Sequence, residues 1–252
     1  MKILNKLFNN KTNKFTSPIK FIGTGSAFYG KYNSSAYFIK NNNLFPMDCG
    51  EKNFEPTRRI IENKINNIKN IYIFITHFHS DHIGSLPTLL FYLKYVNRAI
   101  PFQIICKQEV YETLCTFLKI SGIEESDLSE IIIQTERFNC NNISIDMINT
   151  QHSIYSIGLL IKIKNLRIYY SGDSKTFPEI IKQKMMNDEL DIIYQDISYK
   201  NNEIHMWIND LLQNNIAKKF VYKYKKKIFG YHNIELPLYE FKEMVDVYDI
   251  RK

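Results

Sequence analysis

The chain has 252 residues, of which 44% are hydrophobic and 14% aromatic, and it carries a net charge of +7. This composition supports one substantial buried core and excludes a disordered tail, a collagen-like fibre and a small disulfide scaffold. The longest apolar runs, such as Ile71–Ile75, are far shorter than the roughly 20 residues of a membrane span, so we expect no membrane partner.

Hydrophobic runs and helical periodicity predict one mixed domain over residues 1–252, with residues 1–17 as a loosely ordered N-terminal extension. The predicted strands are Ile19–Ile22, Ala36–Ile39, Leu44–Met47, Ile71–Ile75, Phe102–Cys106, Ile143–Ile148, Leu159–Ile163, Arg167–Tyr170, Ile192–Tyr194 and Lys227–Phe229. The predicted helices are Pro56–Asn66, Leu86–Tyr95, Gln108–Leu118, Pro178–Met186 and Ile208–Leu212. Short turns between the first strands favour antiparallel hairpins, and helices separate the later strands. We therefore expect an α/β (α+β) fold with two sheets and helices packed outside them.

The cysteines and the first residues indicate a cytoplasmic protein. Cys49, Cys106, Cys115 and Cys140 have no CxxC spacing, and we interpret them as free thiols in a reducing compartment. The polar residues 9–11 interrupt the apolar start of the chain, so we predict no signal peptide. The positive charge fits an anionic partner and equally fits the Asn-, Ile- and Lys-rich composition of an AT-rich genome.

The most informative segment carries three histidines and an aspartate within six residues: His77, His79, Asp81 and His82. An exposed loop has no packing need for three imidazoles, and buried unpaired ionisable groups are costly. Neutral imidazole and carboxylate are ligands that Zn²⁺ accepts, so the segment predicts a metal site. His77 and His79 point the same way in an extended segment, whereas Asp81 and His82 follow at the turn and can face a second ion.

Further candidates lie just after predicted strands. These are His152, Asp173 and His232, and side chains at the ends of rigid strands commonly form sites. Taken singly, each signal is weak, because a lone histidine is more often a hydrogen-bonded structural residue and an aspartate after glycine is usually a turn.

Residues His77–Gly84 match HxHxDHIG, which is the signature of the metallo-β-lactamase superfamily. His152, the Ser-Gly-Asp sequence ending at Asp173, and His232 follow in that superfamily's order, so the chain resembles it over residues 19–233. The resemblance implies a four-layer αβ/βα sandwich with a dinuclear metal site at one edge. Zinc is the expected metal, and manganese or iron also suits such ligands.

The resemblance also implies how the two ions are shared among seven ligands. One ion is held by His77, His79 and His152. The second ion is held by Asp81, His82 and His232. Asp173 bridges the two ions.

Other segments resemble ribonuclease Z and related phosphodiesterases more closely, namely Phe21–Phe28, Asn33–Ile39 and Met47–Glu51. Asp48 in the last of these is interpreted as a structural carboxylate beneath the metal loop. Asp196 and His205 resemble a pair in which the carboxylate orients the imidazole. Such a histidine can stabilise the transition state or protonate a leaving alkoxide.

The chain also departs from ribonuclease Z. Tyr29–Asn33 stands where that family carries a Pro-x-x-Arg-x-x-Arg-Asn segment. The long arm that grips tRNA is normally inserted between the residues corresponding to His152 and Asp173. Here that interval holds only the predicted hairpin Gly158–Tyr170. The resemblance therefore does not imply tRNA processing by the usual grip.

The leading hypothesis is a dinuclear metal-dependent hydrolase, most closely a phosphodiesterase or nuclease, in which a metal-bound hydroxide attacks phosphorus. Asp81 would accept the proton of the water, and His205, steered by Asp196, would serve the leaving group. The anionic substrate is RNA, a cyclic nucleotide or a small phosphodiester, which basic stretches such as Lys223–Lys227 would attract. Alternatives are a lactone or thioester hydrolase, which would not need the Asp196–His205 pair, and a non-enzymatic metal-stabilised binding protein.

The C-terminal residues predict one more element. Apolar side chains beyond Leu236 predict a terminal helix that packs on the domain or across a homodimer. These side chains are Phe241, Met244, Val245 and Tyr248.

Overall fold

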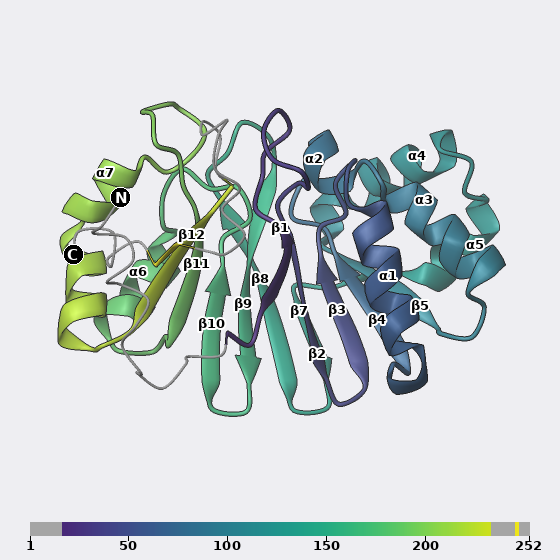
Figure 1. The fold of residues 1–252 in the computed structure, drawn as a ribbon, viewed down its shortest axis with the longest axis horizontal. Helices are drawn as coiled ribbons and strands as arrows, with labels where there is room; N and C mark the ends of the chain where they lie inside the picture. Colours follow the sequence, from purple (N-terminus) through teal and green to yellow (C-terminus); the bar gives the residue numbers. More distant parts are fainter. Residues whose placement is uncertain (1–16, 233–244, 247–252) are drawn as a thin grey trace, which may run out of the picture.

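The computed structural model describes residues 17–232 and 245–246, arranged as two β-sheets between two layers of helices (Figure 1). The first sheet contains β1 (Lys20–Gly23), β2 (Ser35–Lys40), β3 (Asn43–Met47), β4 (Asn70–Phe74), β5 (Phe102–Cys106) and β6 (Ile132–Gln134). The second contains β7 (Arg137–Cys140), β8 (Ile143–Thr150), β9 (Ser156–Ile163), β10 (Leu166–Tyr170), β11 (Ile192–Asp196), β12 (Lys227–Tyr231) and β13 (Val245–Asp246).

The helices are α1 (Phe54–Lys64), α2 (Ser80–Ile83), α3 (Leu86–Phe91), α4 (Tyr111–Ile120), α5 (Glu125–Ile131), α6 (Glu179–Met186), α7 (Ile208–Gln213) and α8 (Asn215–Lys218). Shorter 3-10 or π turns are η2 (Ile65–Asn67), η3 (Tyr92–Val96), η4 (Gln108–Val110) and η5 (Lys219–Lys223).

Strand directions bring several strand ends to one edge of the sandwich. In the first sheet, β1, β2 and β3 pair antiparallel as the short turns predicted, and β3 to β6 pair parallel. In the second sheet, β8 and β9 pair antiparallel, as do β9 and β10, and β10, β11 and β12 are parallel. The strands β8, β10, β11 and β12 therefore run in one direction and end at the same edge.

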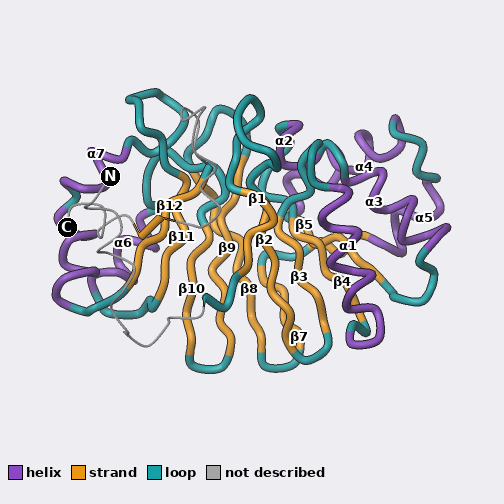
Figure 2. Tube along the Cα trace, in the orientation of Figure 1, coloured by secondary structure: helices purple, strands orange, loops and turns teal. Residues whose placement is uncertain are grey.

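The alternation of side chains along each strand divides the core into three layers. In β4, Ile71 and Ile73 pack against the helices α1, α3, α4 and α5, whereas Phe74 faces the second sheet. Tyr194 of β11 also lies between the sheets, and Ile193 packs under α6, α7 and α8. Figure 2 shows the result, with the strands in the middle and helices on both outer sides. The predicted four-layer arrangement is confirmed.

The predicted strands and the helices predicted up to Leu212 are present, but short elements were missed. β6, β7 and α5 bury few side chains, and α5 buries only Leu128, so they lack a strong hydrophobic period. The prediction of a terminal helix is wrong at Val245–Asp246, which form β13 against β12. Phe241, Met244 and Tyr248 lie outside the described residues, as does most of the predicted N-terminal extension, so the single-domain and homodimer predictions stay predictions.

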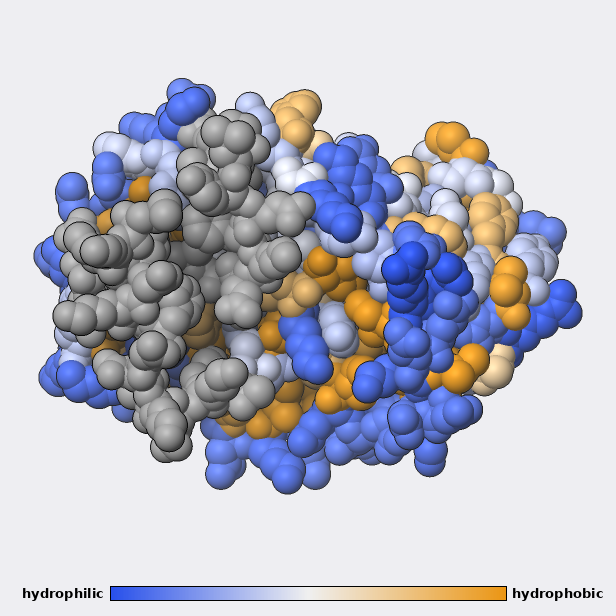
Figure 3. Space-filling model, in the orientation of Figure 1, coloured by the Kyte–Doolittle hydropathy of each residue, from blue (hydrophilic) through white to orange (hydrophobic). Residues whose placement is uncertain are grey.

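None of the helices in the described part of the chain is long and apolar enough to cross a membrane. The lower edge in Figure 3, where the hairpin turns lie, is largely hydrophilic. One of these turns contains Asn41 and Asn42 with φ of 51° and 61°, the backbone that a two-residue hairpin loop requires and that asparagine tolerates.

Candidate metal centre

The predicted ligands converge at the edge where the strands end, opposite the hydrophilic hairpin turns. They are His77 and His79 after β4, Asp81 and His82 in α2, His152 after β8, Asp173 after β10, and His232 after β12. All of them lie close enough to their neighbours to form groups that could hold an ion. Residues up to 155 positions apart in the sequence thus meet in one cluster, as the sequence predicted.

The first group contains His77, His79 and His152. The Nδ1 atom of His79 lies 3.0 Å from Nε2 of His77 and 3.1 Å from Nε2 of His152. A tetrahedral ion with metal–nitrogen bonds of about 2.0–2.1 Å holds its ligand atoms about 3.3–3.4 Å apart. The three nitrogen atoms therefore already stand close to the spacing that one ion requires.

The second group contains Asp81, His82 and His232, all buried. Oδ2 of Asp81 lies 3.6 Å from Nε2 of His82 and 3.9 Å from Nε2 of His232. These are the residues that the family resemblance implied for the second ion.

Asp173 lies between the two groups and contacts both. Its Oδ2 atom is 3.8 Å from Nε2 of His77 and 3.9 Å from Nε2 of His152. Its Oδ1 atom lies 3.3 Å from Nε2 of His82, and its Oδ2 atom lies 3.3 Å from Nε2 of His232. One buried carboxylate thus faces nitrogen atoms of both groups.

The protonation of the cluster fits a divalent ion. Burial holds the pKa of His77 well below its ordinary value and lowers the pKa of His152 to about 4 and of His232 to about 3, so these rings are neutral near pH 7. The buried Nε2 of His82 and Oδ1 of Asp173 face each other at 3.3 Å and, within the described part of the chain, make no other hydrogen bond. Neutral imidazoles, carboxylates and unpartnered buried atoms that face one another are a suitable donor set for a divalent metal.

A charged pair lies within the same cluster. Burial opposes protonation of His82, but the carboxylates of Asp173 and Asp48 outweigh it and hold the pKa of His82 well above its ordinary value. Burial also opposes ionisation of Asp173, but His232 and His82 outweigh it and hold the pKa of Asp173 well below its usual range. The ionised carboxylate of Asp173 therefore favours a positive charge next to it in the cluster.

Asp48 lies beneath both groups and orients them. Its Oδ1 accepts a hydrogen bond from the backbone N–H of Thr76 at 2.7 Å, and its Oδ2 accepts from Thr76 Oγ1 at 3.0 Å and from His82 Nδ1 at 2.9 Å. Because Thr76 Oγ1 donates to Asp48, it accepts from Nδ1 of His77 at 3.0 Å. Nε2 is then the atom that each of these two rings presents to the cluster. The interpretation of Asp48 as a carboxylate under the metal loop agrees with this geometry.

The backbone around Asp48 is packed directly against the metal loop. The N–H of Cys49 donates to the carbonyl of His82 at 2.7 Å. A Cβ on Gly50 would come within 2.6 Å of the carbonyl carbon of Asp81, so only glycine fits there. Gly172, beside Asp173, has a φ of +59° and would place a Cβ 3.0 Å from Cβ of Thr76.

Asp196 and His205 form the pair that the sequence predicted. Asp196 ends β11, is fully buried, and its Oδ2 accepts from Nδ1 of His205 at 2.7 Å. Burial raises the pKa of Asp196 to about 7. Burial lowers the pKa of His205, but the adjacent Asp196 outweighs this and raises it to about 9. Nδ1 of His205 also lies 3.7 Å from Oδ2 of Asp173, so the pair adjoins the cluster.

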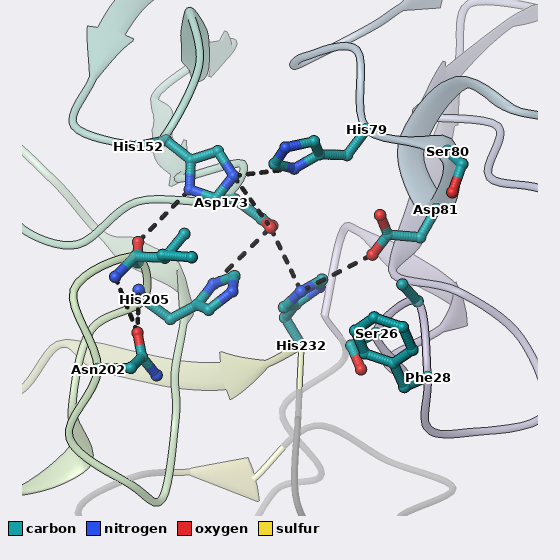
Figure 4. Close-up of a pocket in the computed structure, with 12 residues that line it drawn as sticks. Ser26, Phe28, His79, Ser80, Asp81, His152, Asp173, Asn202, His205 and His232 are labelled. Atoms are coloured by element: carbon teal, nitrogen blue, oxygen red, sulfur yellow. Dashed lines mark hydrogen bonds and ion pairs between the residues drawn. The ribbon is translucent and has the colours of Figure 1, made fainter.

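The cluster opens into a cavity of about 490 Å³ with two loop walls (Figure 4). One wall is the segment Ser26–Phe28, and the other contains Asn202, Ile204 and His205. Sequence reasoning did not single out Phe28, Asn202 or Ile204, because a single apolar or amide side chain in a loop carries no spacing signal.

The basic stretch Lys223–Lys227 does not line this cavity. Lys227 begins β12 and His232 follows its end, so roughly 16 Å of strand separates them. Nζ of Lys226 lies 2.8 Å from a carboxylate oxygen of Asp191. The expectation that this stretch draws substrate into the site therefore finds no support in the geometry.

Comparison with solved structures identifies the fold. The metallo-beta-lactamase fold protein YhfI from Bacillus subtilis superposes with a TM-score of 0.63 at 13% identity, over 86% of this chain and 86% of that one. The chain thus has the metallo-β-lactamase fold, as the histidine motif implied. A family model described as anti-Pycsar protein Apyc1 matches residues 17–238, and the chain belongs to this family.

Similar curated proteins include anti-Pycsar proteins and ribonucleases Z. An anti-Pycsar protein Apyc1 of Bacillus phage BSP38 is 26% identical over 220 residues, which cover 78% of this chain and 83% of the relative. A ribonuclease Z of Methanococcus maripaludis strain C6 is 34% identical over 104 residues, which cover 40% of this chain and 33% of the relative. The chain spans only between 31% and 41% of the length of the first ribonuclease Z relatives.

Proposed function

We propose that this chain is a metal-dependent phosphodiesterase with two metal ions. The observation that carries the proposal is the position of Asp173. Its carboxylate faces nitrogen atoms of both ligand groups and also lies 3.7 Å from His205, which Asp196 orients. Two ion sites and a proton-transferring histidine thus share one cavity. This is the arrangement that phosphoryl transfer to water requires.

The proposed ligands are those implied by the sequence. His77, His79 and His152 would hold one ion, and Asp81, His82 and His232 the other, with Asp173 between them. Zinc suits this set of nitrogen and oxygen donors best, and manganese or iron is compatible with it. When bound, such ions neutralise phosphate charge and lower the pKa of coordinated water.

The chain's own residues would then bind, orient and move protons. Asp81, whose carboxylate lines the cavity, would accept the proton of the attacking water. His205 would donate a proton to the leaving alkoxide, because its Nδ1 is fixed on Asp196 and the ring lines the same cavity. Asn202 would hold the backbone of that loop, since its Oδ1 accepts from the N–H of His205 at 2.7 Å.

A small phosphodiester or cyclic nucleotide fits the site better than a folded RNA. Ribonuclease Z relatives act on RNA, as their name states, which supports phosphodiester chemistry. The cavity of about 490 Å³ is the size of a single small ligand. β9 and β10 are joined by a short turn, so the part of the chain where an RNA-gripping arm would be inserted contains only a hairpin.

The experiment combines metal analysis with a substrate screen on one preparation. Protein stripped with chelator and reloaded with zinc or manganese is assayed on bis-p-nitrophenyl phosphate, 3′,5′-cyclic AMP, an RNA oligonucleotide and a carboxyl ester. We expect about two ions per chain and metal-dependent phosphodiester cleavage. His205→Ala should lower that rate by roughly 10²–10⁴-fold, the usual effect of a positioned acid.

Two variants serve as controls that distinguish the phosphodiesterase proposal from its alternatives. Asp81→Ala removes a proposed ligand, and Asp127→Ala removes a carboxylate of α5 that pairs with Lys94 away from the cavity. Wild-type turnover no higher than that of Asp81→Ala would contradict the proposal. Hydrolysis of the carboxyl ester alone, unaffected by His205→Ala, would support the lactone or thioester reading instead.

A further inference from the structure

Two buried hydroxyl groups lie beside the ligand cluster and have no part in the proposed chemistry. Tyr231 directly precedes His232 and is 2% exposed, and Ser171 is fully buried. The hydroxyl of Tyr231 donates to the carbonyl of Gly172 at 2.7 Å, and Oγ of Ser171 donates to the same carbonyl at 2.6 Å. A carbonyl oxygen has two lone pairs, so these two donors occupy it completely.

The same hydroxyls join three strand ends that supply the site. The N–H of Asp196 donates to Oγ of Ser171 at 2.9 Å, and that Oγ lies 3.0 Å from the hydroxyl of Tyr231. These residues stand at the ends of β10, β11 and β12, the strands that supply Asp173, Asp196 and His232. The hydrogen bonds therefore connect the backbone next to two proposed ligands with the carboxylate that orients the proposed acid.

Gly172 is the position at which this bracing matters. Its φ is +59°, and a Cβ there would lie 2.4 Å from the carbonyl of Ile157, so no side chain can anchor the backbone at this point. Because a peptide unit is planar, the donors that fix the carbonyl of Gly172 also fix the N–H of Asp173. The carbonyl of Asp173 accepts from Oγ1 of Thr150 and Oγ of Ser156, each at 3.2 Å. The backbone of Asp173 is thus held by hydroxyl groups on both sides.

Packing alone does not account for the hydroxyl of Tyr231. Its ring stacks on the ring of Tyr170, with centroids 5.1 Å apart and planes 5° apart, and lies 5.3 Å from the ring of Phe21. Phenylalanine would keep both contacts, because it has the same ring. The role of the hydroxyl can therefore be tested by removing a single oxygen atom.

We propose that Tyr231 is a positioning residue whose hydroxyl, through the carbonyl of Gly172, holds the carboxylate of Asp173 between the two ligand groups. The inference rests on the proposed function, which assigns Asp173 to both ions. Figure 4 shows this carboxylate facing rings from both groups, those of His152 and His232. A displaced carboxylate would fit neither group, so loss of the hydroxyl should weaken the binding of both ions together.

The test titrates zinc into metal-free protein against a competing chelator and records the visible spectrum of the cobalt-loaded protein, which depends on ligand geometry. Tyr231→Phe removes one donor to Gly172, and Ser171→Ala removes the other. Tyr169→Phe is the matched control, because it removes the hydroxyl of another fully buried tyrosine, which makes no hydrogen bond within the described part of the chain. Urea unfolding of the metal-free protein shows whether each variant is folded.

Tyr231→Phe should lower zinc affinity about 10–100-fold at both sites, the usual effect of losing a group that supports metal ligands, and should alter the cobalt spectrum. Ser171→Ala should also weaken both sites, and Tyr169→Phe should leave the affinity and the spectrum unchanged. A folded Tyr231→Phe that loses stability in urea but binds both zinc ions like the wild type would show a purely structural hydroxyl and overturn the inference. Loss of affinity at one site alone would overturn it as well.

Failure of the proposed function appears in the wild type instead. A wild type that binds two ions but cleaves no phosphodiester contradicts the proposed function, and the comparison with Tyr231→Phe still decides this inference. A wild type that binds no zinc contradicts both.

Discussion

Replacing Asp48 by asparagine should weaken metal binding although Asp48 is not itself a proposed ligand. The carboxylate accepts three hydrogen bonds, at 2.7, 3.0 and 2.9 Å, from the N–H and hydroxyl of Thr76 and from His82. Asparagine can keep the first of these through its carbonyl oxygen. Its NH₂ group would then face two donors, so His82 and, through Thr76, His77 lose their fixed orientation.

The size of the effect follows from the role of such supporting groups. Losing a carboxylate that orients a metal-bound histidine typically costs 10–100-fold in affinity, which is about 1.4–2.7 kcal/mol. Because Asp48 supports a ring in each ligand group, both binding events should weaken. Thr76→Val removes the hydroxyl's bonds to His77 and to Asp48 but leaves the bond between Asp48 and His82, so it should weaken the first site more than the second.

Zinc affinity is measured by competition with a fluorescent chelator, under conditions where circular dichroism shows each variant folded. Asp146→Asn serves as the control, because its carboxylate pairs with Arg137 on the surface and such pairs contribute about 0–1 kcal/mol. Wild-type affinity at both sites in folded Asp48→Asn would refute this account of Asp48.

Three further outcomes are expected. Gly50→Ala should destabilise the protein by about 1–3 kcal/mol in urea unfolding and lower metal occupancy, because its Cβ would press on Asp81. Stripping the metal should lower the melting temperature, and zinc at 100 times its Kd should restore about 2.7 kcal/mol, as measured by thermal unfolding. Burial opposes ionisation of Asp191, but Lys226 and Arg167 hold its pKa below the ordinary value, so its stabilising effect is present above about pH 4 and lost below it. Asp191→Asn should therefore make urea stability less dependent on pH between about 5 and 3, and an unchanged profile would contradict this.

The meeting of the proposed ligands in one cluster was predictable from the sequence because their signal is local or ordered. His77, His79, Asp81 and His82 stand together in one segment, and the remaining ligands each follow a strand with a clear hydrophobic run. Asp196 and His205 were found through their resemblance to a known pair, and the structure joins them at 2.7 Å. Strand pairing was not predictable in the same way, because β10 and β11 pair across α6 and their contact depends on the whole sheet.

The elements that were missed have little hydrophobic signal of their own. β7 buries one side chain, Phe138, and β6 is three residues long. Each exists because a longer neighbour, β8 or β5, supplies the hydrogen-bonding edge. Phe28 was missed for the opposite reason: exposed residues contribute nothing to a core, so hydrophobic patterning cannot single them out.

The fold separates the parts of the proposed site that would perform chemistry from those that would select a substrate. The floor comes from the ends of β4, β8, β10, β11 and β12, whose positions are fixed by both sheets and by the buried layer between them. The two walls come from the segments around Phe28 and Ile204, which lie outside the strands and can change without disturbing that layer. Changes in the floor should thus lower the rate for every substrate, whereas changes in the walls should alter which substrate binds. A shared fold with ribonuclease Z would for this reason be compatible with a different choice of substrate.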